Sequence, residues 1–334
     1  MGSRGIFDVN RRTALALGGV GILAAGLSPS SAHAELPVVP GDQFAPATEF
    51  QLGEFKVFAL LDGSFISEDP QNIFGMEQSA EVFEKASRDH FIRSDKFRGF
   101  FTPTLVNTGD QLVLFDTGRG ELSQPGSGNL LKALAGIGVH PRDIDVVVLT
   151  HMHGDHIGGL MQNGVPTYSN ARYVTSPIEF EYWEKLGPGG GGSAQAFAQD
   201  VLPLKDKFTF INPGDEVVPG ITAVEAFGHT PGHMIYLVEA NGKKLMLTAD
   251  TANHFVWSVA YPDWQVVFDI DKAKAAETRR RVFTHLAEER IPFIGYHMPY
   301  PSLGYVEKDG DGFRYVPATY QLQLGHEDEA NPPE

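Results

Sequence analysis

The chain has 334 residues, of which 42% are hydrophobic and 20% charged, and its formal net charge is −16. Such an acidic protein is expected to repel nucleic acid and anionic membrane surfaces, which argues against both as partners. The absence of cysteine excludes disulfides, cysteine-ligated zinc and a cysteine nucleophile.

Residues 1–34 have the pattern of an export signal peptide. A basic region ends in Asn10-Arg11-Arg12, an apolar run covers 13–27, and Ala32-His33-Ala34 fits an A-x-A cleavage site. The apolar run, about 15 residues, is too short to span a membrane. The paired arginines indicate the twin-arginine route. We expect cleavage after Ala34 and a periplasmic or secreted protein; the alternative is an uncleaved, buried N-terminal helix.

Residues 35–50 are rich in proline and predict a loose N-terminal arm, and residues 321–334 predict a flexible acidic tail. Residues 51–320 are expected to form the folded domain. Alternating and continuous apolar runs predict its strands, which we place at 55–65, 102–118, 143–150, 171–176, 221–228, 233–250, 292–297 and 304–318. Amphipathic spacing predicts its helices, at 79–87, 130–138, 177–186, 194–207 and 271–290.

Runs of strands alternate with helices, and the two halves of the chain share a similar order of these elements. This order predicts a sandwich of two sheets with helices on its outer faces. The glycine-rich stretch 187–193 predicts a mobile loop. Export would remove three arginines and one aspartate, so the mature chain would carry a net charge of −18.

The stretch THMHGDHIGG, residues 150–159, predicts a metal site. It directly follows a buried strand, and in extended chain His151 and His153 point to the same side. Gly154 allows a sharp turn, after which Asp155 and His156 can serve a second cation. Three histidines and an aspartate at this spacing rarely occur by chance.

Three further candidate ligands each lie at a strand end: His233, Asp250 and His297. Taken singly, each histidine could be structural, and the aspartate could cap a helix. Together with the histidine stretch they form a set of imidazoles and carboxylates, which suits zinc, manganese, cobalt or iron. A carboxylate such as Asp250 can bridge two such ions.

The order THMHGDHIGG, GHTPGH, TAD and YH resembles the metallo-β-lactamase superfamily over nearly all of 50–320. The resemblance implies an αββα sandwich of mixed sheets, an α/β fold, with the site at one edge. It also implies the roles of the residues: His151, His153 and His233 hold one metal, Asp155, His156 and His297 hold the other, and Asp250 bridges them. Asp116 would orient one of the ligands, and His229 would brace the loop of His233 through hydrogen bonds.

Within the superfamily, the segments FKVFALLDG, LVNTGDQLVLFDTG and FGHTPGHM are similar to the methyl parathion hydrolase group, which consists of exported dinuclear enzymes. The acyl-homoserine lactonases carry a tyrosine shortly after the bridging aspartate, where this chain has Asn253 and His254. The stretches 119–128 and 251–264 depart from the methyl parathion hydrolase pattern. The resemblance also implies a homodimer.

Two bound cations would generate a hydroxide near neutral pH and polarise the bond that it attacks. Asp250 and Asp155 are the expected catalytic residues, and no G-x-S-x-G motif is present. We therefore expect a hydrolase that holds two divalent metal ions, with zinc as the first candidate, and that cleaves small, neutral, activated esters. Organophosphate triesters are the first expected substrate class. A lactonase or arylesterase, including one for acyl-homoserine lactones, is the alternative; a non-catalytic metal-binding scaffold is a distant one.

Four aromatic residues are candidates for an apolar wall that binds the aryl or acyl group of the substrate. Their alternative role is packing in the core or at a dimer face. These residues are Trp183, Phe197, Phe255 and Trp257.

Overall fold

The computed structural model describes residues 46–122 and 125–319. Two seven-stranded sheets form its centre. In the first sheet, β1, β2, β5 and β6 pair antiparallel, and β6, β7, β10 and β11 pair parallel. Its strands are β1 Ala47–Leu52, β2 Phe55–Leu60, β5 Thr104–Asn107, β6 Leu112–Phe115, β7 Val146–Val148, β10 Arg172–Thr175 and β11 Phe208–Phe210.

The second sheet is antiparallel except for its β15–β16 pair. Its strands are β12 Glu216–Val218, β13 Ile221–Glu225, β14 Met234–Ala240, β15 Lys243–Ala249, β16 Phe293–Gly295, β17 Leu303–Asp309 and β18 Gly312–Pro317. Two hairpins lie outside the sheets: β3 Gly63–Glu68 with β4 Lys96–Phe101, and β8 Met161–Gln162 with β9 Val165–Pro166.

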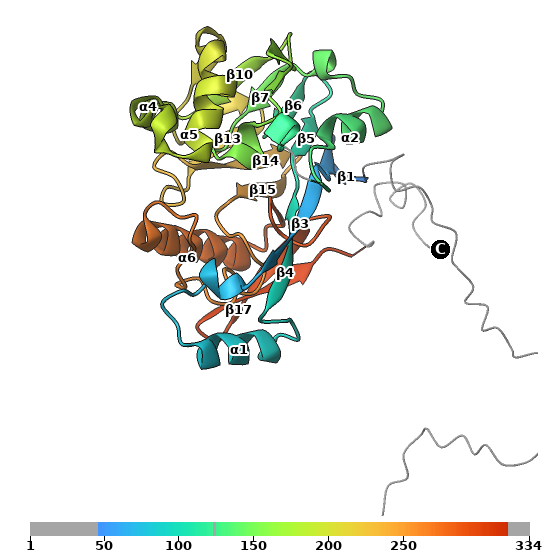
Figure 1. Cartoon of the computed structure of the whole chain (residues 1–334). Helices are drawn as coiled ribbons and strands as arrows, with labels where there is room; N and C mark the ends of the chain where they lie inside the picture. Colours follow the sequence, from blue (N-terminus) through green and yellow to red (C-terminus); the bar gives the residue numbers. More distant parts are fainter. Residues whose placement is uncertain (1–45, 123–124, 320–334) are drawn as a thin grey trace, which may run out of the picture. The chain divides into compact units, whose positions relative to one another are not determined.

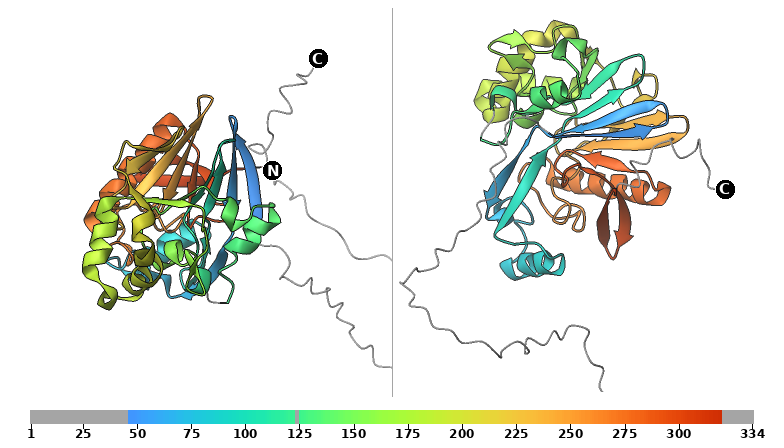
Figure 2. Two further views of the ribbon diagram at one scale, coloured as in Figure 1. Left: turned by 90° about the horizontal axis from the view of Figure 1, so that it is seen from above. Right: turned by 90° about the vertical axis from the view of Figure 1, so that its right-hand side faces the viewer.

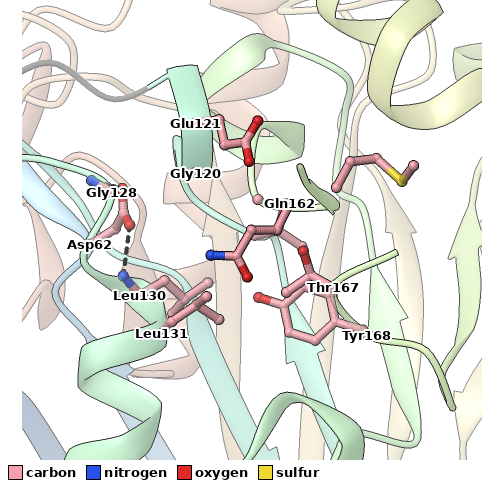
Figure 3. Close-up of a pocket in the computed structure, with 12 residues that line it drawn as sticks. Asp62, Gly120, Glu121, Gly128, Leu130, Leu131, Gln162, Thr167 and Tyr168 are labelled. Atoms are coloured by element: carbon pink, nitrogen blue, oxygen red, sulfur yellow. Dashed lines mark hydrogen bonds between the residues drawn. The ribbon is translucent and has the colours of Figure 1, made fainter. Parts of the chain in front are cut away.

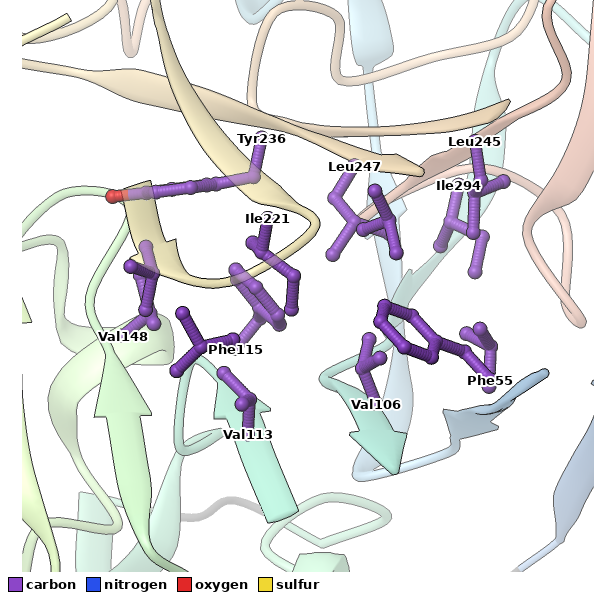
Figure 4. Close-up of a cluster of buried hydrophobic side chains, with 14 of the residues drawn as sticks. Phe55, Val106, Val113, Phe115, Val148, Ile221, Tyr236, Leu245, Leu247 and Ile294 are labelled. Atoms are coloured by element: carbon purple, nitrogen blue, oxygen red, sulfur yellow. The ribbon is translucent and has the colours of Figure 1, made fainter. Parts of the chain in front are cut away.

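Side chains from both sheets meet in a buried layer (Figure 4). Phe55, Val106 and Phe115 come from the first sheet and face Leu245 and Leu247 of the second. None of these five side chains exposes more than 6% of its surface. This layer fixes the edges of the two sheets in position relative to each other. The candidate functional site lies across both edges.

Helices cover the two outer faces (Figures 1 and 2). Those on the first sheet pack Leu134 and Phe180 against it, and the long helix on the second sheet packs Phe283 and Leu286. The α-helices of the described residues are α1 Ala80–Asp89, which lies away from the two sheets, and α2 Leu130–Gly136, α3 Gly154–Ile157, α4 Pro177–Leu186, α5 Gly192–Ala196 and α6 Lys272–Glu289. The layers run helix, sheet, sheet, helix, which confirms the predicted αββα sandwich.

Strands β3 and β4 extend away from the sandwich and lead to α1 (Figure 1). A separate aromatic cluster fills this region and includes Phe83, Phe97 and Trp257. None of the described helices is both long and apolar enough to cross a membrane.

Most predicted elements are present, but three expectations need correction. The predicted arm includes the start of β1, because residues 47–50 pair with β2. The hairpin of β3 and β4 was not predicted, since its strands alternate weakly between apolar and polar residues. The expected loop 187–193 contains a short 3₁₀ turn and the start of α5. The signal, residues 35–45 and the tail 321–334 lie outside the described residues.

We predict that Leu245→Ala destabilises the fold through the layer between the sheets. Leu245 is fully buried there, and truncation of a buried leucine leaves a cavity that costs about 2–5 kcal/mol. The free energy of unfolding, from urea titration, should fall by that amount. The neighbouring exposed Lys244→Ala should change it by less than about 0.5 kcal/mol. A loss below about 1 kcal/mol for Leu245→Ala would contradict this account of the core.

Candidate metal centre

The histidine stretch lies where β7 ends at the edge of the first sheet. His151 is fully buried and lies three residues beyond the end of the strand at Val148. His153 precedes the single turn of α3, which carries Asp155 and His156. The strand-then-turn geometry predicted for this stretch is therefore present, and it directs its two halves toward different neighbours.

Four side chains converge in a first group: His151, His153, His229 and Asp250. The Nε2 atom of His229 lies 2.9 Å from Nδ1 of His153 and 3.2 Å from Nε2 of His151. It also lies 3.3 Å from Oδ2 of Asp250. The potential ligand atoms of the group all lie within 4.8 Å of one another, close enough to share one cation.

Asp155, His156 and His297 form a second group. The Nε2 atoms of His156 and His297 lie 3.7 Å and 3.5 Å from Oδ2 of Asp155. Asp250 joins the two groups, because its Oδ1 is 3.2 Å from His156 and its Oδ2 is 3.1 Å from His297. This position between the groups suits a bridging carboxylate, which was its predicted role.

Two buried polar atoms at the centre of the site show whether its residues suit metal ions. Nε2 of His156 and Oδ1 of Asp250 are 3.2 Å apart, yet neither has a hydrogen-bond partner. The other ring nitrogen of His156 donates to Asp116 at 2.8 Å. A buried carboxylate and an imidazole nitrogen facing each other in this way need a positive charge between them. Imidazole and carboxylate ligands suit zinc and similar divalent ions, so the residues fit two metals.

The structure corrects the prediction for the two histidines of GHTPGH. His229, expected to brace the loop, points into the first group, whereas His233, the expected ligand, points away from it. His233 donates from Nδ1 to the Ala226 carbonyl at 2.9 Å, and its Nε2 accepts from the backbone N–H of Asp250 at 3.3 Å. Burial lowers the pKa of His233 to about 3, which keeps the ring neutral for these two bonds.

Buried carboxylates orient the metal-facing rings from behind. Asp116 accepts from His156 and from both the backbone and the hydroxyl of Thr150. Asp269 accepts from Nδ1 of His229 at 2.9 Å and pairs with Arg279 at 2.8 Å. Such partners fix the tautomer of a metal-binding histidine. The predicted supporting role of Asp116 agrees with this geometry, whereas no signal in the sequence pointed to Asp269.

Glu179, in the first turn of α4, ties together the two loops that carry the histidines. Its Oε1 accepts from the backbone N–H of Met152 at 3.0 Å and from the Trp183 indole at 2.7 Å. Its Oε2 accepts from the Thr230 hydroxyl at 2.7 Å and from the backbone N–H of Gly232 at 2.9 Å. Met152 lies between His151 and His153, and Thr230 follows His229. One buried carboxylate therefore sets the distance between the loops.

Gly232 permits this approach, because a Cβ at that position would lie 2.2 Å from the backbone nitrogen of Glu179.

Nearby carboxylates favour positive charge at two of the histidines in the site. Burial opposes protonation of His229, but hydrogen bonds to Asp250 and Asp269 and their charges raise its pKa to about 9. The pKa of His156 is likewise raised against its burial, by Asp250 and Asp116. Divalent ions would take the place of these protons, because metal ligands bind in the deprotonated form.

A cavity of about 640 Å³ opens onto both groups. Four ligand candidates line it, and Arg119 is the only lysine or arginine among its described lining residues. The four candidates are His153, Asp155, Asp250 and His297. Its apolar wall contains Phe65, Ile66, Phe101, Leu122, Pro125 and Phe268.

The four aromatic candidates for the pocket wall are not among the described residues that line this cavity. Phe197 and Trp257 are almost fully buried in two different core clusters. Phe255 packs against core clusters, and Trp183 is 4% exposed, with its ring centre 5.6 Å from the ring centre of His153. Their alternative role, core packing, is the correct one.

A two-sheet sandwich that presents two histidine–aspartate groups at one edge defines a class of dinuclear metalloproteins. Residues 102–293 match the metallo-beta-lactamase superfamily, and the chain belongs to that superfamily. This confirms the family resemblance of the sequence. The narrower likeness to methyl parathion hydrolases stays a prediction.

Two curated relatives are N-acyl homoserine lactonases. The protein from Bacillus sp is 28% identical over 172 residues, which cover 50% of this chain and 60% of the relative. AttM of Agrobacterium fabrum is 30% identical over 125 residues, 35% of this chain and 44% of the relative. The chain thus matches three fifths or less of the length of these relatives.

Two solved structures match over nearly their whole length. AidC, a dizinc quorum-quenching lactonase in complex with the product N-hexanoyl-L-homoserine, has a TM-score of 0.78 at 26% identity. The hydrolase AbOPH of the beta-lactamase superfamily has a TM-score of 0.75 at 26% identity. Each match covers 83% of this chain and 99% of the other.

We predict that His229→Ala and His233→Asn have different effects on metal binding. Loss of His229 should lower bound zinc from about two ions to about one per chain and reduce activity by at least about 100-fold. His233→Asn should keep near-normal metal content but lower the melting temperature, because it disrupts two buried hydrogen bonds. Elemental analysis and thermal unfolding measure both. Loss of metal in His233→Asn alone would reverse our assignment.

We predict that Glu179→Gln loosens both ligand loops. The amide would turn an N–H group toward donors that now face a carboxylate oxygen, which should cost about 1–3 kcal/mol of stability. Zinc affinity should fall about 10- to 100-fold, as is usual when a supporting partner is lost. Competition with a chelator measures the affinity. Glu181→Gln on the same helix is the control, and equal effects of both variants would contradict this role.

Proposed function

We propose that this protein is a dinuclear zinc hydrolase that opens N-acyl homoserine lactones. The observation that carries the proposal is the match to a dizinc lactonase over 99% of that chain, combined with two adjacent ligand groups in this one. The curated relatives named as lactonases support the same substrate class. Lactones therefore replace organophosphate triesters as the first expectation.

The chain's own residues supply the rest of the chemistry. Two divalent cations, when bound, activate a water molecule and polarise the ester carbonyl. Asp155 and Asp250 face the cavity, and a carboxylate there can accept the proton of the attacking water and return it to the departing alkoxide. Lactone and water then become one hydroxy acid. Asp116 orients the His156 ring by accepting a hydrogen bond from its Nδ1.

The cavity suits an acyl chain beside a polar reacting group. Its wall is apolar, and Ile66, Leu122 and Phe268 on it expose 53%, 36% and 44% of their surfaces. Burying such side chains against an alkyl chain contributes about 25 cal/mol per Å² of apolar surface removed from water. An N-acyl lactone offers that surface, whereas a small dimethyl phosphotriester offers less.

Three expectations from the sequence stay proposals beside this one. They are export by the signal at 1–34, with a periplasmic or secreted location, and assembly as a homodimer. A non-catalytic scaffold is disfavoured because both ligand groups are complete and open to a cavity.

We predict that the zinc-loaded protein hydrolyses N-hexanoyl homoserine lactone with a kcat/KM at least about 100-fold above that for an aryl phosphotriester, a difference of about 2.7 kcal/mol. Initial rates with zinc and with manganese measure this. Removal of metal with a chelator should abolish turnover, and added zinc should restore it.

Asp250→Asn should lower the lactonase rate by more than about 1000-fold, because the amide cannot bridge two cations as a carboxylate does. Asp110→Asn, in the exposed β5–β6 turn, is the matched control. A faster triester rate in wild type would restore the phosphotriesterase interpretation. No turnover of either substrate by protein that holds two metals would refute the hydrolase proposal for these classes.

A further inference from the structure

Arg119 is the only lysine or arginine among the described residues that line the metal-facing cavity. It lies between Gly118 and Gly120, just after β6. It shares the cavity with Asp155, Asp250 and the apolar wall. A cation in this place can contact a bound substrate without being a metal ligand.

Contacts on two sides hold the guanidinium in position. It lies over the ring of Phe101, 5.3 Å from the ring centre, which is a favourable cation–π arrangement. One terminal nitrogen donates to the Leu122 carbonyl at 3.1 Å. The Phe101 ring is also 5.7 Å from the ring of His297. Phe101 therefore connects Arg119 to a metal-binding histidine.

The backbone beneath Arg119 is anchored as well. Its N–H donates to the buried carboxylate of Asp62 at 3.1 Å. Asp62 also accepts from the N–H groups of Gly128 and Leu130, and Figure 3 shows the bond to Leu130. On the other side, a Cβ at Gly120 would lie 2.1 Å from the Gly158 carbonyl. The main chain at Arg119 thus has little freedom, so its side chain starts from a fixed point.

Most of the donors of Arg119 are unused within the described structure. A guanidinium has five N–H donors, and one hydrogen bond from the Arg119 side chain is present among the described residues. No ion pair among those residues includes Arg119. Half-buried donors beside an apolar wall favour a ligand that brings an acceptor oxygen.

We propose that Arg119 determines substrate specificity by donating a hydrogen bond to the acyl-amide carbonyl of an N-acyl lactone. This inference rests on the proposed lactonase function. In this arrangement the reacting ring carbonyl lies at the two metal-ligand groups, and the alkyl chain packs against the apolar wall. The amide carbonyl is the remaining strong acceptor of such a substrate. Alkyl lactones and simple aryl esters lack it.

The test compares two lactones that differ in the amide, N-hexanoyl homoserine lactone and γ-decalactone, in the zinc-loaded full chain. Arg119→Met should lower kcat/KM for the amide-bearing lactone by about 10- to 100-fold, the range for a hydrogen bond from a charged group, mainly through KM. The rate on γ-decalactone should change by less than about threefold. Arg119→Lys should recover part of the loss, since it keeps the charge but not the planar fork.

Arg93→Met is the matched control, because it removes the same charge from an exposed surface ion pair. It should change neither rate. Equal losses on both lactones in Arg119→Met with normal zinc content would mean that Arg119 only supports the wall, and would overturn the inference alone. No loss on either lactone would overturn it too. If wild type hydrolyses neither lactone, the proposed function fails first, and the inference fails with it.

Discussion

Glu179 is a fully buried carboxylate that accepts three hydrogen bonds from the two ligand loops and one from Trp183 on its own helix. Asp116 and Asp269 are placed similarly behind His156 and His229. Burying a charge costs several kcal/mol unless hydrogen bonds or an opposite charge compensate it. The four hydrogen bonds offset part of this cost for Glu179, although burial still raises the pKa of its carboxyl. Around the metal-facing rings, the surplus of carboxylates over fixed cations is compensated only when positive charge enters the site. The site is therefore organised for cations before any ion binds.

The two-sheet sandwich makes this arrangement possible because each sheet brings part of the ligand set. The His151 stretch follows β7 of the first sheet, and Asp250 follows β15 of the second. A register shift near the end of β15 and the positive φ of 42° at Ala249 turn the chain just before Asp250. The two sheets are held by the apolar layer between them. Core packing therefore decides whether Asp250 reaches both groups.

Sequence reasoning predicted the sandwich and most ligands because both depend on local pattern. Strand alternation places His151 and His153 on one side, and the spacing of the motif is specific. It chose wrongly between His229 and His233, since both follow the same strand and only the loop's tertiary contacts, such as the bond from His229 to Asp269, decide which ring faces the site. Glu179 resembles any acidic residue in the first turn of a helix. Three of its four partners lie on loops far away in the sequence.

The pocket wall was the least predictable part, and the reason is physical. Burying an aromatic side chain is favourable whether protein or a ligand covers it. The residue type alone therefore does not tell whether Trp183 or Phe65 lines the pocket. What separates them is the β3–β4 hairpin, which has weak alternation and yet brings Phe65 beside the metal groups. The ligands at the sheet edges can serve many ester substrates alike. Selection among these substrates must then depend on the hairpin and on the segment that carries Arg119, where apolar surface and a single positive charge are combined.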